Sequence, residues 1–345
     1  MTQRWRRRPE GSNWGDFGPD DQRGRLNLLT PEKVRQGVAE VREGRTFCLS
    51  LPLDLPGKNR LNPRRHPPQL MAALRGGARN YDFALSREDP RWSDVVCDDA
   101  VLLWTQYSTQ WDALSHVGAE FDADGDGVAE HVFYNGFRGG ADMTIDASAT
   151  DDTAPLAGPV RAARLGIENM ATACVQGRGV MIDLVAAFGT ERRLVGHEDL
   201  AAACARQNVV VEPGDMVCLH TGFATALLAM DGDPDLDRLA RTGAVLDGSD
   251  PRLQQWIAES GLAVLIADNY AVEAVPGAAR PGRHPFLPLH ELCLFKLGIH
   301  LGELWHLAEL AEWLRAAGRS RFLLTAPPLR LPGAVGSPVT PVATV

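Results

Sequence analysis

The densest group of polar side chains in the sequence lies between residues 106 and 116. Asp112 and His116 stand four residues apart there, and so do Gln106 and Gln110. A carboxylate beside an imidazole can form an oriented acid–base pair or contribute to a metal site. On a helical turn Asp112 and His116 would share a face, and on a loop they could converge. The spacing alone also fits a solvated aspartate and an ordinary histidine.

The elements around this segment indicate how it is positioned. A β-type run at residues 101–107 leads into it, and loops that follow strands often carry functional groups. Further strands are predicted at 46–53, 180–185, 216–221, 263–267 and 322–328, and helices at 31–43, 198–206, 251–260 and from about 288. Strands that alternate with helices predict an α/β domain. Residues 54–98 lack clear periodicity and are predicted to be a long loop over the surface or over a cleft.

The segment resembles the signature of the cyclase family, which includes bacterial kynurenine formamidase and isatin hydrolase. The usual form of that signature is His-x-Gly-Thr-His-x-Asp-x-Pro-x-His. Thr109, Asp112 and His116 match it, while Ser108 takes the glycine place and Leu114 the proline place.

The first two histidine places of the signature hold Gln106 and Gln110. In the well-known members those histidines and the aspartate are the metal ligands. Imidazole is a strong zinc ligand, whereas a neutral amide oxygen is a weak one. Two alternatives follow from the resemblance. Either a zinc or manganese ion is held weakly by Asp112, Gln106, Gln110 and His116, with extra ligands such as His290, or the site works without a metal, which we expect.

The resemblance extends along most of residues 14–342. The matching segments are 14–15, 21–24, 26–32, 166–168, 179–183, 213–215, 268–273, 288–290, 298–303, 326–329 and 336–339. Their order along the chain identifies it as a member of this family. Membership implies an α/β fold in which residues 14–345 form a single domain, with a β-barrel-like (swivelling β/β/α) core flanked by helices. The basic residues 1–13 are expected to be disordered.

His290 and Glu303 stand where the family carries its later active-site histidine and its acidic or amide residue. The resemblance therefore places both with Asp112 and His116 in a catalytic group. In the metal-free alternative, His116 or His290 is the general base, and Asp112 or Glu303 orients it.

Four residues are predicted to bind substrate. Gln106 and Gln110 would donate hydrogen bonds to a substrate carbonyl, as in an oxyanion site. Trp111 and Tyr134 could line an apolar pocket, or they could equally be core residues.

A second acidic group, Asp122, Asp124 and Asp126, resembles the first half of an EF-hand calcium loop. The twelfth position of that loop holds Phe133 rather than glutamate. A polar hairpin tip is the favoured interpretation, and any calcium bound there would have a structural role.

Composition limits the class of partner. The net charge is −9 and the pI about 5.5, so nucleic acid is not expected to bind. No apolar run reaches the roughly 18 residues of a membrane helix, and residues 1–13 lack the apolar core of a secretory signal. The six cysteines are scattered, as is usual for free thiols in a reducing compartment. We therefore expect a cytoplasmic protein.

The first functional hypothesis is a hydrolase that acts on an amide, ester or lactone of a small cyclic or aromatic metabolite. The alternative is a cyclase or dehydratase that acts on a biosynthetic, polyketide-like intermediate. A third hypothesis is a degenerate member that only binds its ligand, which the presence of Asp112, His116, His290 and Glu303 together disfavours. The expected partners are a small-molecule substrate and further copies of the chain, as a homodimer or homotetramer.

Overall fold

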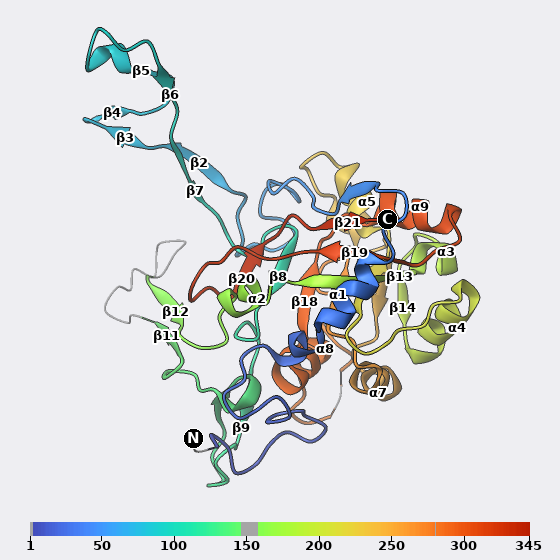
Figure 1. Ribbon diagram of the computed structural model, residues 1–345. Coiled ribbons are helices and arrows are strands. Elements are labelled where there is room, and N and C mark those ends of the chain that lie inside the picture. Colours follow the sequence, from blue (N-terminus) through green and yellow to red (C-terminus); the bar gives the residue numbers. More distant parts are fainter. Residues whose placement is uncertain (1–2, 146–157, 280) are drawn as a thin grey trace.

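The computed structural model describes residues 3–145, 158–279 and 281–345. Its centre is a nine-stranded mixed sheet that curls into a half-barrel (Figure 1). In spatial order the strands are β1 (Thr46–Cys48), β21 (Val342–Thr344), β19 (Arg321–Thr325), β13 (Gln176–Asp183), β15 (Met216–His220), β17 (Val264–Ala267), β18 (His300–Glu303), β8 (Gln110–Asp112) and β20 (Gly336–Pro338). The predicted fold, a single α/β domain with a barrel-like core, is confirmed at this level.

The four central strands β13, β15, β17 and β18 run parallel, and the outer strands pair antiparallel. Parallel strands gather their carboxyl ends at one edge of the sheet, where α/β proteins commonly bind ligands. Asp183, His220 and Glu303 are the last residues of β13, β15 and β18. This edge therefore carries titratable side chains at several neighbouring strand ends.

Helices cover both faces of the sheet. They are α1 (Pro31–Val38), α2 (Glu168–Thr172), α3 (Leu184–Phe188), α4 (His197–Gln207), α5 (Phe223–Leu228), α6 (Leu236–Leu239), α7 (Pro251–Ser260), α8 (Pro288–His290) and α9 (Ala308–Ala316), with 3-10 turns η1 (Gly24–Leu28), η2 (Leu85–Arg87) and η3 (Tyr134–Gly136) and a π-helix η5 (Glu291–Leu297). Successive side chains of a strand point to opposite faces. Val180 and Ile182 accordingly join one core with α4 and α7, while Met181 joins another with α9.

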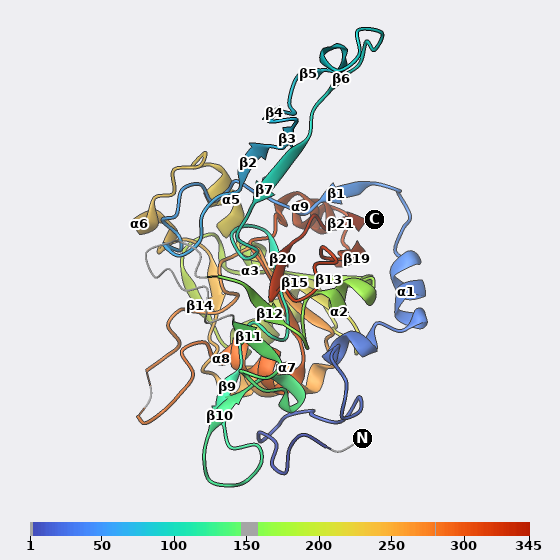
Figure 2. The same ribbon diagram turned by 90° about the vertical axis from the view of Figure 1, so that its left-hand side faces the viewer.

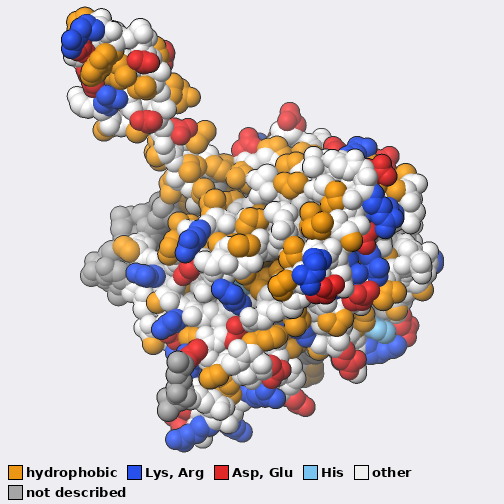
Figure 3. All heavy atoms as spheres, viewed as in Figure 1, with side chains coloured by type: hydrophobic (Ala, Val, Ile, Leu, Met, Phe, Trp, Pro, Cys, Tyr) orange, Lys and Arg blue, Asp and Glu red, His pale blue; other side chains and the backbone are white. Residues whose placement is uncertain are grey.

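Residues 69–102 leave the body as a projecting arm, visible from two directions (Figures 1 and 2). It consists of three short antiparallel pairs: β2 (Gln69–Ala72) with β7 (Asp99–Leu102), β3 (Leu74–Arg75) with β4 (Ala78–Arg79), and β5 (Phe83–Ala84) with β6 (Val95–Val96). This differs from the predicted loop over residues 54–98. Only residues 54–68 lie on the body, and the arm ends in exposed apolar side chains (Figure 3). The base of the arm is closed by the rings of His66 and Trp104, whose centroids are 4.7 Å apart.

Three smaller pairs complete the described strands: β9 (Ala119–Phe121) with β10 (Glu130–Val132), β11 (Met143–Ile145) with β12 (Val160–Ala162), and β14 (Arg193–Val195) with β16 (Ala244–Leu246).

The N-terminal residues differ from the expected disorder. Trp5 is buried and stacks edge-on against Trp14, with ring centroids 5.7 Å apart. The backbone N–H groups of Arg6 and Arg7 donate to the carbonyl oxygen of Ala123. The large apolar surface of Trp5, interrupting the basic run, explains why this segment packs against the body.

One helix and one strand are shorter than predicted. The first helix begins at Pro31, with the Thr30 hydroxyl accepting the Lys33 N–H, but it ends at Val38 rather than near residue 43. The chain turns there, with the Glu40 and Val41 N–H groups bonded to the carbonyls of Gly37 and Val38, and Glu43 and Gly44 then donate to the carbonyl of Val345. The strand predicted at 46–53 is reduced to β1. Within the described residues, no helix is long and apolar enough to cross a membrane.

Candidate active site

Two adjacent strands supply the centre of the candidate site. In the pairing of β8 with β18, Gln110 lies directly opposite Glu303. Residues that face each other across strands have side chains in contact, and the Gln110 Nε2 is 3.2 Å from Glu303 Oε2. Asp112 lies two residues along β8, on the same face, with Oδ1 3.5 Å from Gln110 Nε2. All three side chains are almost fully buried.

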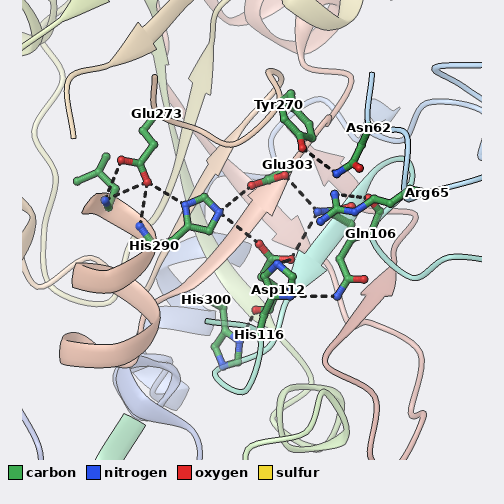
Figure 4. A network of polar contacts seen from close by, with 12 residues as sticks. Asn62, Arg65, Gln106, Asp112, His116, Tyr270, Glu273, His290, His300 and Glu303 are labelled. Atoms are coloured by element: carbon green, nitrogen blue, oxygen red, sulfur yellow. Dashed lines mark hydrogen bonds and ion pairs between the residues drawn. The ribbon is translucent and has the colours of Figure 1, made fainter. Parts of the chain in front are cut away.

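His290 reaches this group from α8 (Figure 4). Its Nε2 is 3.2 Å from Glu303 Oε1 and 3.9 Å from Asp112 Oδ2. Its Nδ1 is 2.9 Å from Glu273 Oε1. The Glu273 carboxylate also accepts the backbone N–H groups of Leu289 and His290. Glu273 therefore fixes both the start of the helix and the ring that it carries.

His116 lies on the other side of Asp112, in the turn that follows β8. Its Nε2 is 3.8 Å from Asp112 Oδ1, and its Nδ1 is 3.4 Å from Gln106 Nε2. The His116 side chain is 22% exposed, whereas those of Asp112 and His290 are 1% and 3% exposed. His116 is thus the most accessible of these three titratable groups.

Burial and neighbouring charges give His116 and His290 different pKa values. Burial and the nearby His290 lower the pKa of His116 to about 4, so its ring is neutral at pH 7. Burial also disfavours a charged His290, but hydrogen bonds to Glu273 and Glu303 prevail and raise its pKa to about 10. Burial and the carboxylate of Glu303 raise the pKa of Asp112 to about 8. The site therefore holds one neutral and one protonated imidazole on either side of the Asp112 carboxyl group.

His300, at the start of β18, supports Asp112 through the backbone. Its Nδ1 is 2.9 Å from the carbonyl oxygen of Asp112. Burial lowers the pKa of His300 to about 4, so it acts as a neutral hydrogen-bond donor.

Residues 54–66 cover the group from the side of the arm. The Arg65 guanidinium donates to the carbonyl oxygen of Gln106 at 2.7 Å, and Asn62 Nδ2 lies 3.0 Å from the Tyr270 hydroxyl (Figure 4). Between them is a space of only about 10 Å³, lined in part by Arg65, Gln106, Tyr107 and Tyr270. Residues 54–66 therefore leave little open space beside Gln106 in this structure.

The structure brings together Gln106, Gln110, Asp112, His116, His290 and Glu303 and places two other predicted residues elsewhere. Trp111 points to the opposite face of β8, where it is fully buried against Trp305 and donates to the carbonyl of Ala326. Strand alternation forces this, because Gln110 and Asp112 occupy the face of the site. Trp111 is thus a core residue, as the second interpretation of the sequence allowed.

Tyr134 is also a core residue rather than a substrate contact. It lies in η3, fully buried, with its hydroxyl 3.5 Å from Asp21 Oδ2. Its ring packs so closely on Gly298 that a Cβ there would lie 2.7 Å from it. Neither contact involves the polar network around Asp112.

The candidate metal group keeps Asp112 from the set predicted from the sequence, includes His290 and Glu303, and leaves out Gln106, Gln110 and His116. Asp112, His290 and Glu303 bring one ligand atom each within 4.8 Å of one another. Gln106 and Gln110 instead direct their amide nitrogens at His116 and at Glu303.

This group of one imidazole and two carboxylates fits a divalent ion such as zinc. Asp112 Oδ2 is buried without a hydrogen-bond partner among the described residues. His290 has its Nδ1 against the carboxylate of Glu273, as metal-ligating histidines do. A ligating imidazole must first lose its proton, so the raised pKa of His290 works against the metal at neutral pH.

The acidic segment Asp122–Asp126 lies at the tip of the β9–β10 hairpin, as favoured from the sequence. Asp122 accepts backbone N–H groups of Gly125, Asp126 and Gly127. Strands rather than helices flank this segment. It is therefore a hairpin tip with hydrogen bonds within the turn, and not an EF-hand.

Sequence reasoning did not assign Glu273 or Arg65 to the site. Glu273 lies in an apolar stretch, Tyr-Ala-Val-Glu-Ala-Val at 270–275, and a lone acid in such a stretch predicts a buried, paired carboxylate. Arg65 belongs to a run of prolines and arginines in which no local signal distinguishes it.

Comparisons with known proteins agree with the fold. A family described as "Putative cyclase" matches residues 49–274. A crystal structure described as a novel cyclase is 34% identical, with a TM-score of 0.73 and coverage of 97% of each chain. Isatin hydrolase A from Labrenzia aggregata, bound to benzyl benzoate, is 15% identical over 87% of this chain and 93% of that one, with a TM-score of 0.54. Isatin hydrolase A from Ralstonia solanacearum is also 15% identical, over 87% and 91%, with a TM-score of 0.53.

Among curated proteins, none matches the chain. The isatin hydrolases are distant and share the fold. The family match covers more than half of the sequence, and the 34% identity to the cyclase structure extends over 97% of it. As the resemblance of its motifs indicated, the chain belongs to the putative cyclase family.

Proposed function

We propose that this protein is a hydrolase that cleaves an amide, ester or lactone bond of a small cyclic or aromatic molecule. The observation that carries the proposal is the carboxyl group of Asp112 between two imidazoles, His116 and His290, that are held in opposite protonation states. Separated acid and base groups of this kind are typical of catalytic centres. Family membership and the fold shared with isatin hydrolases support the same class of reaction.

In the proposed mechanism His116 is the general base. It is neutral and the most accessible of the three groups, so it can take a proton from water that attacks the substrate carbonyl. Gln106 Nε2, 3.4 Å from His116 Nδ1, orients the ring, and Asp112 Oδ1 lies 3.8 Å from its Nε2.

His290 supplies the positive charge. In this mechanism its protonated ring, fixed by Glu273, stabilises the negative charge that develops on the carbonyl oxygen. The Gln110 Nε2 is directed at Glu303, so Gln110 stabilises the orientation of Glu303 more directly than it could stabilise the substrate.

A divalent ion at this centre would be held by Asp112, His290 and Glu303. Bound there, it would polarise the substrate carbonyl and favour ionisation of a bound water. The protonated His290 can supply the positive charge without it, so we propose that the reaction does not depend on a tightly held metal.

The side chains beside the site indicate that the substrate is small and partly apolar. Pro56, Leu61, Tyr107 and Tyr270 line the space beside the site, together with the polar side chains of Arg65 and Gln106. Aromatic and apolar walls around a few polar groups are usual for pockets that bind cyclic molecules.

The alternative is an intramolecular cyclisation or dehydration by the same acid–base pair. The observation that favours it is the enclosure of the site, with about 10 Å³ of space beside Gln106 and Arg65, because a closed site excludes water.

The test is a turnover screen with formyl-amides, lactones and cyclic imides in ¹⁸O-labelled water, followed by mass spectrometry. Hydrolysis places one ¹⁸O atom in the product, whereas cyclisation or dehydration places none. A His116→Ala variant measured in parallel identifies turnover that arises at this site. Products without label, or turnover equal in both proteins, would contradict hydrolysis at Asp112.

A further inference from the structure

A second pocket lies at the same edge of the sheet, apart from the candidate active site. It has a volume of about 570 Å³ and borders α3, α5, α6 and α9. His220, the last residue of β15, lines it. β15 is separated from β18, which carries Glu303, by β17 alone, so the two sites are roughly 10 Å apart at the usual strand spacing.

His220 is the buried polar group of this pocket. Its Nδ1 is 2.9 Å from Asp183 Oδ1, and the other oxygen of Asp183 accepts Arg315 Nη1 at 2.8 Å. Asp268 also lies near the ring, and its carboxylate accepts hydrogen bonds from the N–H groups of Thr221 and Gly222. His220 Nε2 has no hydrogen-bond partner among the described residues. This nitrogen is therefore available to a ligand in the pocket.

The same environment favours a charged ring. Burial opposes protonation of His220, but the hydrogen bond to Asp183 and the charge of Asp268 prevail and raise its pKa. Asp183 thus has the role that an orienting carboxylate has beside a functional histidine.

Two further cations line the pocket from α6 and the turn after it. Arg238 and Arg241 are exposed, and within the described ranges their guanidinium groups make no hydrogen bond or ion pair. Arg252, an exposed arginine outside the pocket, is by contrast paired with Glu198. The acidic side chains that line the pocket are Glu191 and Glu312. Arg315 is paired with Asp183, so the lining cations that face these two acids are Arg238, Arg241 and the His220 ring.

The rest of the lining suits a small organic molecule. Thr190, Thr225 and Thr242 offer hydroxyl groups, while Val185 and several alanines form an apolar wall. Arginine groups in a fork geometry and a protonated imidazole are the usual partners of carboxylate and phosphate oxygens.

We propose that this pocket binds a small organic anion, a carboxylate or a phosphate ester, with its charged group among His220, Arg238 and Arg241. The site is distinct from the group around Asp112 and does not depend on the reaction proposed for that group. An apolar or aromatic part of the ligand would lie against the wall formed by Val185 and the alanines.

Calorimetric titration of the full-length protein with phthalate and with inorganic phosphate tests the proposal. We expect binding to the unmodified protein and at least about tenfold weaker binding to the Arg238→Met/Arg241→Met double variant, since one hydrogen bond to a charged group is worth about that factor. A His220→Gln variant, which keeps a polar side chain but loses the ring, should weaken binding in the same direction.

Two matched variants locate the bound anion. Arg252→Met removes an exposed arginine outside the pocket, and Arg65→Met removes the arginine beside the candidate active site. Both should bind phthalate as the unmodified protein does. The double variant should unfold at an unchanged temperature, because the guanidinium groups that it removes bond to no other described residue. Failure of both anions to bind at millimolar concentration, equal binding by the double variant, or loss of binding in Arg65→Met would overturn the proposal.

Discussion

Glu273 holds His290 twice, by its ring and by its backbone. Glu273 Oε1 is 2.9 Å from the Nδ1 of the His290 ring and 3.0 Å from its backbone nitrogen. A carboxylate that fixes both the position and the charge of an imidazole defines the pH range in which that imidazole is cationic.

The Glu273→Gln variant should therefore shift the basic limb of the pH–rate profile. In the unmodified protein His290 loses its proton near pH 10, and turnover should fall above that pH. Removing the charge of Glu273 lowers the pKa of His290, so the limb should move to lower pH. The rate of hydrolysis measured from pH 6 to 11 checks this. A Glu291→Gln variant, altered at the residue that follows His290, is the control. An unshifted limb in Glu273→Gln would exclude His290 as the cation.

The free energy of unfolding should also depend on the protonation of His290. The folded pKa of His290 lies above the ordinary value of 6.5, so its contribution is fully present below about pH 6.5 and is lost as the pH rises through about 10. Urea unfolding at pH 7 and pH 10.5 should show a smaller pH-dependent loss of unfolding free energy in Glu273→Gln than in the unmodified protein.

His116→Ala should lower turnover by about 10²–10⁴-fold, the usual contribution of a general base. The acid limb of the profile should also flatten, since His116 must be neutral and its pKa is about 4. His131→Ala is a suitable control because this histidine is exposed on the β10 hairpin. Near-normal turnover in His116→Ala, with an intact circular dichroism spectrum, would leave His290 as the remaining candidate base.

Purified protein should carry less than one equivalent of zinc or manganese, and turnover should survive a chelator. The reason is the replacement of two imidazole ligands by Gln106 and Gln110, together with the proton on His290. Elemental analysis and rates measured with and without chelator check this. Stoichiometric metal whose removal abolishes turnover would favour the metal-bound alternative.

The homodimer or homotetramer expected from the sequence remains a prediction, and the arm offers a way to test it. Its apolar side chains are exposed, Leu70 by 73% and Leu74 by 76%, and two-stranded ribbons are rarely stable alone in water. A Leu70→Asp/Leu74→Asp variant should have a lower native mass than the unmodified protein by light scattering. Leu194→Asp, on an exposed strand of the body, should leave the mass unchanged. A single-chain mass for the unmodified protein would contradict the expected assembly.

The elements with strong local signals could be predicted from the sequence. Asp250 and Pro251 begin α7 and Gly261 ends it, as their capping preferences indicate. The apolar runs that became β13, β15 and β17 are buried on both faces, which is why they read as continuous apolar segments.

Other parts depend on contacts that no local pattern contains. β8 is three residues long, and its polar residues Gln110 and Asp112 are buried only because Glu303 and His290 meet them. The arm strands are two to four residues long and lack an alternating pattern, so nothing distinguished them from a loop. The family motif placed His290 with Asp112, but the role of Glu273 follows from a helix start that only the fold creates.

The arm leaves the body between Arg65 and Gln106, the residues that line the small space beside Asp112. The arm strands pair only with one another, so the arm can change in length without breaking a pairing of the central sheet. The two segments at its base, which hold Arg65 and Gln106, cannot change in this way. An engineer who replaces residues 69–102 by a short turn should keep His66 and Trp104, whose rings close the base. Shortening the arm beyond them would displace Arg65 and Gln106 and so change the space beside the site.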